Sequence, residues 1–439
     1  MRPRLVAARD SHPAPVPGRL PPALLTTPDY YGTLAAVRSL GRSGVSVTVA
    51  SPSRWSLSGS SKYATGSVRC PPVLEATSFI DWLCEFGATH EKHVLLPTCD
   101  DTAWLYALNR ERLSEYFHLS VPEIGAIHQL LDKSALHEHA VQAGLLTPPS
   151  WRPESFDDVE RIAREARFPV ALKPVTQVLY RTRRKGVRVD RPEDLAPMFR
   201  AFANHRHERS LLAFDPALSM PLVQEYYPEA ATGIYNLSGF ARGGRVIGVL
   251  ASRKLLQRPR RMGVGVCFEE APVMPDLVAG VERLTARVGF NGVFETEFIE
   301  HEGTPMLIDF NPRFYNQMAF DIARGLPLPL LAYHYALGDQ ERVSRLCEEH
   351  ARAPGSSGRV YAHRTGFRLL VGLQGLSGAF SKDEATAWNE WYRAHRERCV
   401  DPVYDADDPW PSRLDVGQVA KNSLRHPRAF LRSVVLDRD

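Results

Sequence analysis

Two neighbouring stretches of the sequence carry acidic and amide side chains at strand-like spacing. In "FETEFIE", Glu295 and Glu297 project from one face of an extended strand. In "MLIDFN", Asp309 and Asn311 do the same. If the two strands pair as a hairpin about the turn "EHEGT", Glu297 faces Asp309 and Asn311 across about 5 Å. Left alone, such paired acids repel each other, so a cation must compensate them.

These oxygen ligands suit magnesium, which proteins normally share between a few carboxylates and the phosphates of a nucleotide. The alternative is a surface hairpin whose acids pair with arginines, which are abundant in this chain. The segment by itself does not decide between the two interpretations.

Lysine is scarce here, since only eight of the 54 basic residues are lysines. Lys133 in "LDKSAL" and Lys173 at the end of "FPVALKP" are therefore less typical of generic surface charge. A lysine at a strand end is a compact point charge that suits phosphate oxygens. Taken alone, either is more often a solvated surface residue.

The elements that must position these residues fall into two regions. Pro22 to Ser53 predicts a strand, a helix and a second strand, the βαβ opening of a doubly wound sheet. The strand "HVLLPT" follows, and then a helix that begins near Asp100 and Asp101. Ligands commonly lie at the carboxyl ends of such strands. No GxGxxG follows the first strand, which argues against a nicotinamide site.

From Leu131 onward, strands and helices mix as in an α+β domain. A hairpin is predicted with Gly243 and Gly244 at its turn. The remaining predicted elements are helices over 131–146, 191–205 and 274–290 and strands over 168–175 and 221–229.

An acid on one strand followed by "DFNPR" on the next, with both lysines in register, resembles the ATP-grasp superfamily. Over Pro22 to Gly338 the chain is similar to its carboxylate-amine ligase branch. The resemblance implies a fold of α/β and α+β class. We expect a disordered leader (1–21), a Rossmann-like pre-ATP-grasp βαβ domain (22–130), a two-lobed ATP-grasp domain (131–337) and a helical or irregular appendage (338–439).

By this resemblance, Glu297, Asp309 and Asn311 bind Mg²⁺, with two ions expected and Mn²⁺ as a substitute. Arg313 would stabilise charge on the transferring phosphoryl group. Most members of the superfamily carry glutamate where this chain has Asp309, so the ligand here is one methylene shorter.

The resemblance also implies an ATP site. Lys133 and Lys173 fall where the family places two nucleotide-contacting lysines. "LVQEYYPE" looks like the family's linker strand, which would turn the side chain of Gln224, the carbonyl of Glu225 and the amide of Tyr227 toward adenine. The alternative is a plain core strand.

Of two basic loops, the one after Lys173 departs from the family pattern. Many relatives have a glycine-rich flap after the strand lysine, where this chain has "TQVLYRTRRKGVRVD". Arg184 and Lys185, with the neighbouring arginines, could neutralise triphosphate through side-chain charge. A solvated basic turn is the alternative.

The second basic loop is "SRKLLQRPRRMGVGV". By resemblance, Arg253, next to Lys254, lies near the γ-phosphate or an acyl phosphate. Gly263 and Gly265 let the backbone approach a substrate carboxylate. The alternative is a hairpin end followed by a surface loop.

The function implied is an ATP-dependent ligase that joins a carboxylate to an amine through an acyl phosphate, releasing ADP and phosphate. An amino acid, a peptide or a carrier-bound acid would serve as substrate, as in specialised-metabolite assembly. Asp29, Tyr30 and Tyr31 are candidates for the acceptor pocket, although the tyrosines could only pack and Asp29 could cap a helix. A carboxylase or phosphoryl transferase, and a non-catalytic nucleotide-binding protein, stay open as alternatives.

The composition and sequence pattern argue against several classes of protein. No apolar run approaches the roughly 18 residues of a membrane span, and the N-terminus lacks a secretory signal, so a cytoplasmic location is expected. No basic stripe of the nucleic-acid-binding kind is present. Six scattered cysteines predict reduced structural thiols.

Family resemblance suggests a homodimer. In the C-terminal region, Asp405, Asp407 and Asp408 are expected to cap a turn.

Overall fold

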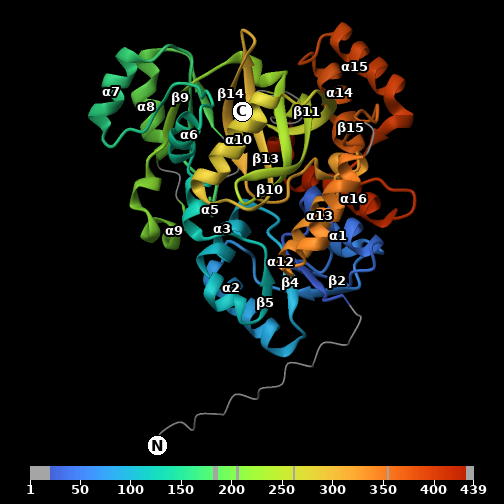
Figure 1. Cartoon of the computed structure of the whole chain (residues 1–439). Coiled ribbons are helices and arrows are strands. Elements are labelled where there is room, and N and C mark those ends of the chain that lie inside the picture. Colours follow the sequence, from blue (N-terminus) through green and yellow to red (C-terminus); the bar gives the residue numbers. More distant parts are fainter. Residues whose placement is uncertain (1–19, 181–185, 204–206, 261–262, 353–354, 432–439) are drawn as a thin grey trace, which may run out of the picture.

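The computed structural model describes residues 20–180, 186–203, 207–260, 263–352 and 355–431. Nearly all of the predicted leader lies outside these ranges, as do Arg184 and Lys185. Within them, three β-sheets organise the chain (Figure 1). All six cysteines are free thiols. No helix in the described part of the chain combines the length and apolar character that a membrane crossing needs.

The first sheet contains the predicted βαβ unit: β1 (Ala23–Leu25), α1 (Tyr31–Arg42) and β2 (Val47–Ser51). It has the order β3-β2-β1-β4-β5, and every neighbouring pair is parallel. All three residues of β1 are fully buried, as expected of a parallel sheet covered on both faces. Its other elements are β3 (Gly66–Arg69), α2 (Ala76–Thr89), β4 (His93–Leu95), α3 (Asp100–Leu108), α4 (Arg110–Ser114), β5 (Phe117–Leu119) and α5 (Ile124–Leu131).

The second sheet forms a lobe that is green in Figure 1. Its order is β6-β9-β7-β8, with antiparallel neighbours, and it has its own core around Leu172, Phe199 and Val223. The lobe contains β6 (Ser150–Trp151), α7 (Phe156–Glu165), β7 (Val170–Lys173), β8 (Val187–Val189), α8 (Pro192–Ala203) and β9 (Leu222–Glu225). Of the other elements in this stretch, α6 (Lys133–Gln142) packs against α5, and α9 (Arg209–Phe214) lies between α8 and β9 in the chain.

The third sheet has the order β14-β13-β10-β11-β12-β15-β16. The predicted hairpin is confirmed, with Gly243 and Gly244 at its turn at φ values of 58° and 74°. Such positive φ values favour glycine. The strands are β10 (Ile234–Arg242), β11 (Arg245–Arg258), β12 (Val264–Ala271), β13 (Gly292–His301) and β14 (Thr304–Asn311), and α10 (Pro275–Val288) packs against them.

The last hundred residues add two strands to this third sheet, which the sequence did not predict. β15 pairs with β12 and β16 pairs with β15. The boundaries proposed for the four segments stay predictions. The C-terminal elements are α11 (Met318–Ala323), α12 (Leu328–Ala336), α13 (Gln340–Ala351), β15 (Val360–Ala362), α14 (Arg364–Ser377), α15 (Lys382–His395), β16 (Cys399–Val400), α16 (Trp410–Arg425) and α17 (Pro427–Phe430).

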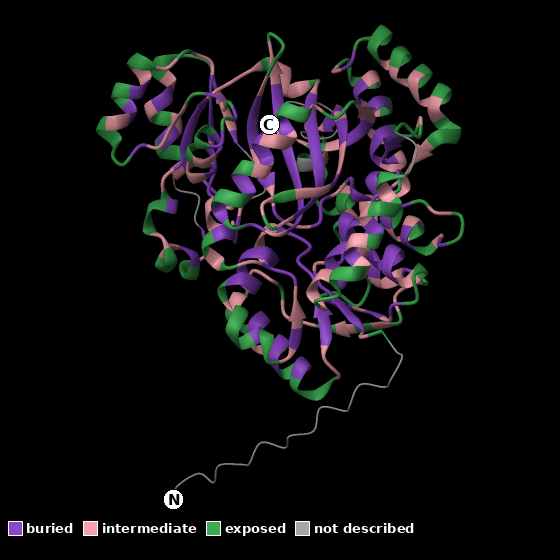
Figure 2. Ribbon diagram, viewed as in Figure 1, coloured by how far each residue is buried: buried purple, intermediate pink, exposed green. Residues whose placement is uncertain are grey.

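The C-terminal segment is fixed to the first sheet's layer through a buried ion pair. Arg38 Nε lies 2.9 Å from Asp408 Oδ2, and the Asp408 side chain is fully buried. Ser61 Oγ and the Lys62 backbone N–H also donate to Asp408. The turn-cap prediction is therefore wrong for Asp408, although Asp405 does accept the backbone N–H of Asp407. Figure 2 shows the sheets as the most buried part of the molecule, with exposed residues concentrated on the outer helices.

Candidate active site

The β13–β14 hairpin is antiparallel, as predicted, and places Glu297 directly opposite Asp309. Asn311 lies two cross-strand pairs further along, opposite Glu295. Since directly paired residues project from the same face of a sheet, all four side chains point to one side. On β10, Asn236 pairs with Glu297 and extends the polar face into the sheet.

Two lysines from different elements neutralise the paired acids. Lys133, the first residue of α6, places Nζ 2.6 Å from Asp309 Oδ1. Lys254 on β11 places Nζ 2.7 Å from Glu297 Oε1, and its side chain is 5% exposed. The expected compensating cations are thus present as ammonium groups. Lys133 and Lys254 thus contact these two acids, where the alternative interpretation expected arginines.

Lys173, at the end of β7, lies beside β9. Its Nζ donates to Gln224 Oε1 at 2.6 Å, and Gln224 Nε2 donates to Ser150 Oγ at 3.0 Å. Burial, and secondly the charge of Lys133, lower the pKa of Lys173 to about 8. An anion beside Lys173 would favour the charged form of its ammonium group, so an anion is the ligand that suits this position.

Two adjoining cavities meet at these acids and lysines. The first, the β9 cavity, is lined by Lys173, Gln224, Glu225, Tyr226 and Tyr227. The second, the Arg313 cavity, extends toward the first sheet. Both cavities are lined by Lys133, Gln177, Lys254, Gly263, Glu297 and Asp309.

The Arg313 cavity is closed by the N-terminal layer. Arg313 Nε donates to Asp100 Oδ1 at 2.8 Å, and Nη2 donates to Asn311 Oδ1 at 2.6 Å. Asp100 begins α3, just beyond the carboxyl end of β4. The end of a parallel strand therefore contributes to the cavity, as predicted for this fold class. Gly263 and Gly265 also line it.

Arg253 is not brought to the acids. It neighbours Lys254 on β11, and successive strand residues point to opposite faces. Because Lys254 faces Glu297, Arg253 faces away, where its Nη2 lies 2.9 Å from Glu300 Oε2. It lines neither cavity. The expected place of Arg253 beside the γ-phosphate therefore conflicts with the strand alternation.

The three N-terminal candidates for the acceptor pocket diverge. Asp29 Oδ1 accepts the backbone N–H of Leu57 and does not cap α1. Cys99, Asp101 and Asp100 raise the pKa of the Tyr30 hydroxyl, which places Tyr30 near the start of α3, and the Tyr30 residue is 46% exposed.

Tyr31 turns instead toward the C-terminal segment. Its hydroxyl lies 3.4 Å from both ring nitrogens of His363, and His363 Nε2 lies 3.2 Å from Asp415 Oδ2. Neither Tyr30 nor Tyr31 lines the two cavities.

Two site residues were not assigned a role from the sequence. Gln177 lines both cavities, and its turn is held by the Leu179 N–H, which donates to Asp101 Oδ1 at 2.6 Å. Glu295 is buried in the Arg313 cavity wall, where burial and Glu297 raise its pKa to about 7. The strand alternation had placed Glu295 on the same face as Glu297, which was the available signal.

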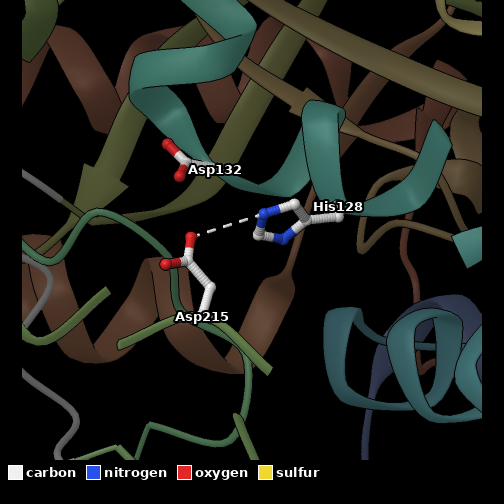
Figure 3. A group of neighbouring side chains, drawn as sticks. All are labelled: His128, Asp132 and Asp215. Atoms are coloured by element: carbon white, nitrogen blue, oxygen red, sulfur yellow. Dashed lines mark ion pairs between the residues drawn. The ribbon is translucent and has the colours of Figure 1, made fainter. Parts of the chain in front are cut away.

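A further cluster supports the start of α6. His128, Asp132 and Asp215 converge in Figure 3, with His128 Nε2 3.6 Å from Asp215 Oδ2. The Arg152 guanidinium lies 3.2 Å from Asp132 and 3.8 Å from Asp215, so these acids already hold a cation. Asp132 Oδ1 accepts the backbone N–H groups of Ser134 and Ala135 and caps α6. The cluster thereby positions Lys133.

No protein-family model matches the chain, and no curated protein sequence matches it. Solved structures do. The biotin carboxylase domain of the Hydrogenobacter thermophilus 2-oxoglutarate carboxylase is 16% identical, with 73% of this chain and 70% of that chain covered and a TM-score of 0.56. An L-amino acid ligase from Bacillus licheniformis is 15% identical, with 73% and 75% covered and a TM-score of 0.55.

The parallel five-stranded sheet followed by antiparallel sheets is the shared architecture. The chain has the ATP-grasp fold. N5-carboxyaminoimidazole synthetase from Staphylococcus aureus is also similar, at 14% identity, with 72% of this chain and 77% of that chain covered and a TM-score of 0.52. At these identities the likeness establishes the ATP-grasp fold alone. Since carboxylases and a ligase share it, the branch and the reaction need separate arguments.

Proposed function

We propose that this ATP-grasp protein is an ADP-forming ligase that joins a carboxylate to an amine through an acyl phosphate. The observation that carries the proposal is the meeting of two cavities at Glu297, Asp309 and their lysines. One cavity suits a nucleotide and the other suits a second substrate. The shared polar wall is where a phosphoryl group would pass from one to the other.

In the β9 cavity, ATP would lie with adenine against β9 and its phosphates toward Lys173 and Lys133. Adenine would meet the side chain of Gln224, the carbonyl of Glu225 and the amide of Tyr227. This direction is supported by Lys133, which lines both cavities, while Lys173 lines the β9 cavity.

The donor set Glu297, Asp309 and Asn311 fits Mg²⁺ or Mn²⁺, because these ions prefer carboxylate and amide oxygens. Glu297, Asp309 and Asn311 would hold the ion, whose positive charge would offset the negative charge of the phosphates. Lys133 and Lys254 now contact the two carboxylates, so binding would release both ammonium groups. The released lysines could then contact phosphate oxygens from the same wall.

The Arg313 cavity would hold the carboxylate that attacks the γ-phosphate. Arg313 is fixed by Asp100 and Asn311, so its guanidinium is preorganised to stabilise charge on the phosphoryl group and then on the tetrahedral oxyanion. An amine would displace phosphate and form the amide. Because water would hydrolyse the acyl phosphate, we expect the β6–β9 lobe to close over the site during turnover.

The main alternative is a carboxylase, in which bicarbonate attacks the γ-phosphate in place of an organic carboxylate. The H. thermophilus domain was solved with MgADP and bicarbonate, and that likeness is what favours this candidate. The convergence of Lys133, Lys173, Glu297, Asp309 and Arg313 argues against a non-catalytic nucleotide-binding protein. The expected homodimer and cytoplasmic location stay predictions.

The proposal is tested by ADP release from MgATP with pooled amino acids and dipeptides, each with and without pooled amines, and with bicarbonate alone. A ligase should release ADP with a carboxylate and amine pool and yield a new amide by mass spectrometry. Bicarbonate-dependent release without any organic carboxylate would favour the carboxylase. Asp309→Asn is the matched inactive control for contaminating ATPases.

A further inference from the structure

Glu295 is a buried carboxylate whose hydrogen bonds come from three side-chain amides. Its Oε1 accepts from Asn236 Nδ2 and, at 2.7 Å, from Gln317 Nε2. Its Oε2 accepts from Asn311 Nδ2 at 2.5 Å. The side chain is only 2% exposed, so water cannot supply alternative partners. All three amides turn N–H toward it, which is the arrangement that a carboxylate with only acceptor oxygens requires.

The amide of Asn311 is fixed at both ends. Its Nδ2 donates to Glu295, and its Oδ1 accepts from Arg313 Nη2 at 2.6 Å. A guanidinium is purely a donor. If the Asn311 amide were turned over, its oxygen would face the Glu295 carboxylate and its NH₂ group would face the Arg313 guanidinium.

Asn236 shows how strongly the carboxylate orients its neighbours. Its Oδ1 is buried and has no hydrogen-bond partner among the described residues, while its Nδ2 reaches Glu295. Asn236 therefore donates its N–H to Glu295 while its side-chain carbonyl oxygen has no hydrogen-bond partner among the described residues. The orientation of the three amides thus follows from the buried carboxyl oxygens of Glu295.

We propose that Glu295 is a positioning residue that keeps Asn311 Oδ1, rather than Nδ2, available to the metal ion. The inference rests on the proposed function, in which Asn311 is a metal ligand. An amide NH₂ has no lone pair to offer, whereas the amide oxygen is a good ligand for a hard cation. Partners that orient metal ligands commonly change metal affinity 10- to 100-fold when they are removed.

The test uses Glu295→Gln, which keeps the shape and changes the pattern of donors and acceptors. The glutamine side chain has a single oxygen, which would accept the hydrogen bonds of Asn236 and Gln317. Its NH₂ group would therefore face Asn311 Nδ2. Asn311 would then turn over and withdraw Oδ1. We expect Mn²⁺ affinity in the presence of ADP, measured by electron paramagnetic resonance of free Mn²⁺, to fall at least tenfold.

A compensating double variant, Glu295→Gln with Asn311→Asp, restores the pairing. The new amide N–H can donate to one oxygen of the new carboxylate, and the other oxygen faces Arg313 and the metal. We expect Mn²⁺ affinity within about threefold of wild type. Glu282→Gln is the control, because Glu282 accepts the Val246 N–H far along the same sheet.

Unchanged Mn²⁺ affinity in Glu295→Gln would overturn the inference. So would a double variant that binds no better than the single one, because donor and acceptor pairing would then not be the cause. If wild-type protein fails to bind Mn²⁺ with ADP, the proposed function fails first and the positioning role with it. Thermal unfolding of each variant separates these results from loss of fold.

Discussion

At the scale of single residues, Asp309 and Glu297 each hold a lysine where a metal ion would bind. This arrangement keeps two half-buried acids compensated in the absence of ligand, since unpaired charges in such surroundings are costly. It also couples the lysines to the metal, because the same carboxylate oxygens serve both.

Asp309→Asn tests this coupling. The change keeps the shape but removes the charge that both Lys133 and the metal need. We expect MgATP turnover to fall more than about 100-fold, since metal and phosphate positioning carry most of a phosphoryl transfer. Turnover is measured as ADP release, with circular dichroism to confirm folding. Activity near that of wild type would remove Asp309 from the site.

Lys173 predicts a pH dependence of nucleotide binding. Burial lowers its pKa to about 8 in the ligand-free protein, so the ammonium is charged below that pH and neutral above it. Bound phosphates favour the charged form and would raise the pKa again. ATP affinity should therefore fall above pH 8, by up to about tenfold per pH unit.

Calorimetric titration of ATP between pH 7 and 9.5 measures this effect. Lys173→Arg should flatten the profile, because a guanidinium keeps its charge over the whole range. Equal losses of affinity in both proteins would show that another group is responsible.

At the scale of elements, strand alternation in β11 separates two neighbouring cations. Lys254 faces Glu297 and both cavities, while Arg253 faces Glu300 on the opposite side. We expect Lys254→Gln to lower turnover more than about 100-fold and Arg253→Gln less than about threefold, since only the first faces the charge that develops. Comparing the kcat values of the two variants tests this expected difference. A larger loss for Arg253 would support the role inferred from family resemblance.

The start of α6 depends on Asp132. Asp132→Ala removes two backbone caps and leaves Arg152 without a buried partner. We expect a loss of about 1 to 2 kcal/mol from the missing cap alone and a rise in the KM for ATP, because Lys133 follows directly. Urea unfolding gives the stability. Asp132→Asn should retain the cap, so an equal loss in both variants would count against the capping explanation.

The hairpin, its register and the face of Glu297 and Asp309 could be predicted because alternation and a turn motif are local signals. The oriented amides around Glu295 could not, since Asn236 and Gln317 reach it from distant parts of the chain. β15 and β16 also escaped prediction. Strands of three and two residues carry no periodicity, and only the pairing of β15 with β12 and of β16 with β15 defines them.

At the scale of the whole molecule, the C-terminal segment joins the third sheet to the N-terminal layer. β15 and β16 extend the sheet (Figure 1), and Asp408 fixes the segment to α1 through Arg38. The segment therefore links the two layers that line the Arg313 cavity. Its sequence gave no indication of this, because the partners are some 370 residues apart.

Asp408→Ala should be strongly destabilising. It leaves Arg38 buried without its partner, and breaking such a pair costs about 3 to 5 kcal/mol. Asp407→Ala is the matched control, because Asp407 is 55% exposed and pairs with Lys62 at the surface. Thermal unfolding should show a large fall in the midpoint for the first variant and little change for the second. Similar midpoints would mean that the buried pair does not anchor the segment.

The central claim is that a carboxylate becomes an acyl phosphate in the Arg313 cavity. The most direct measurement is hydroxylamine trapping with MgATP and pooled carboxylates, with products identified by mass spectrometry. We predict a hydroxamate of one carboxylate class, formed with stoichiometric ADP and absent with Asp309→Asn. ADP release that needs the carboxylate but yields no hydroxamate at saturating hydroxylamine would contradict the account.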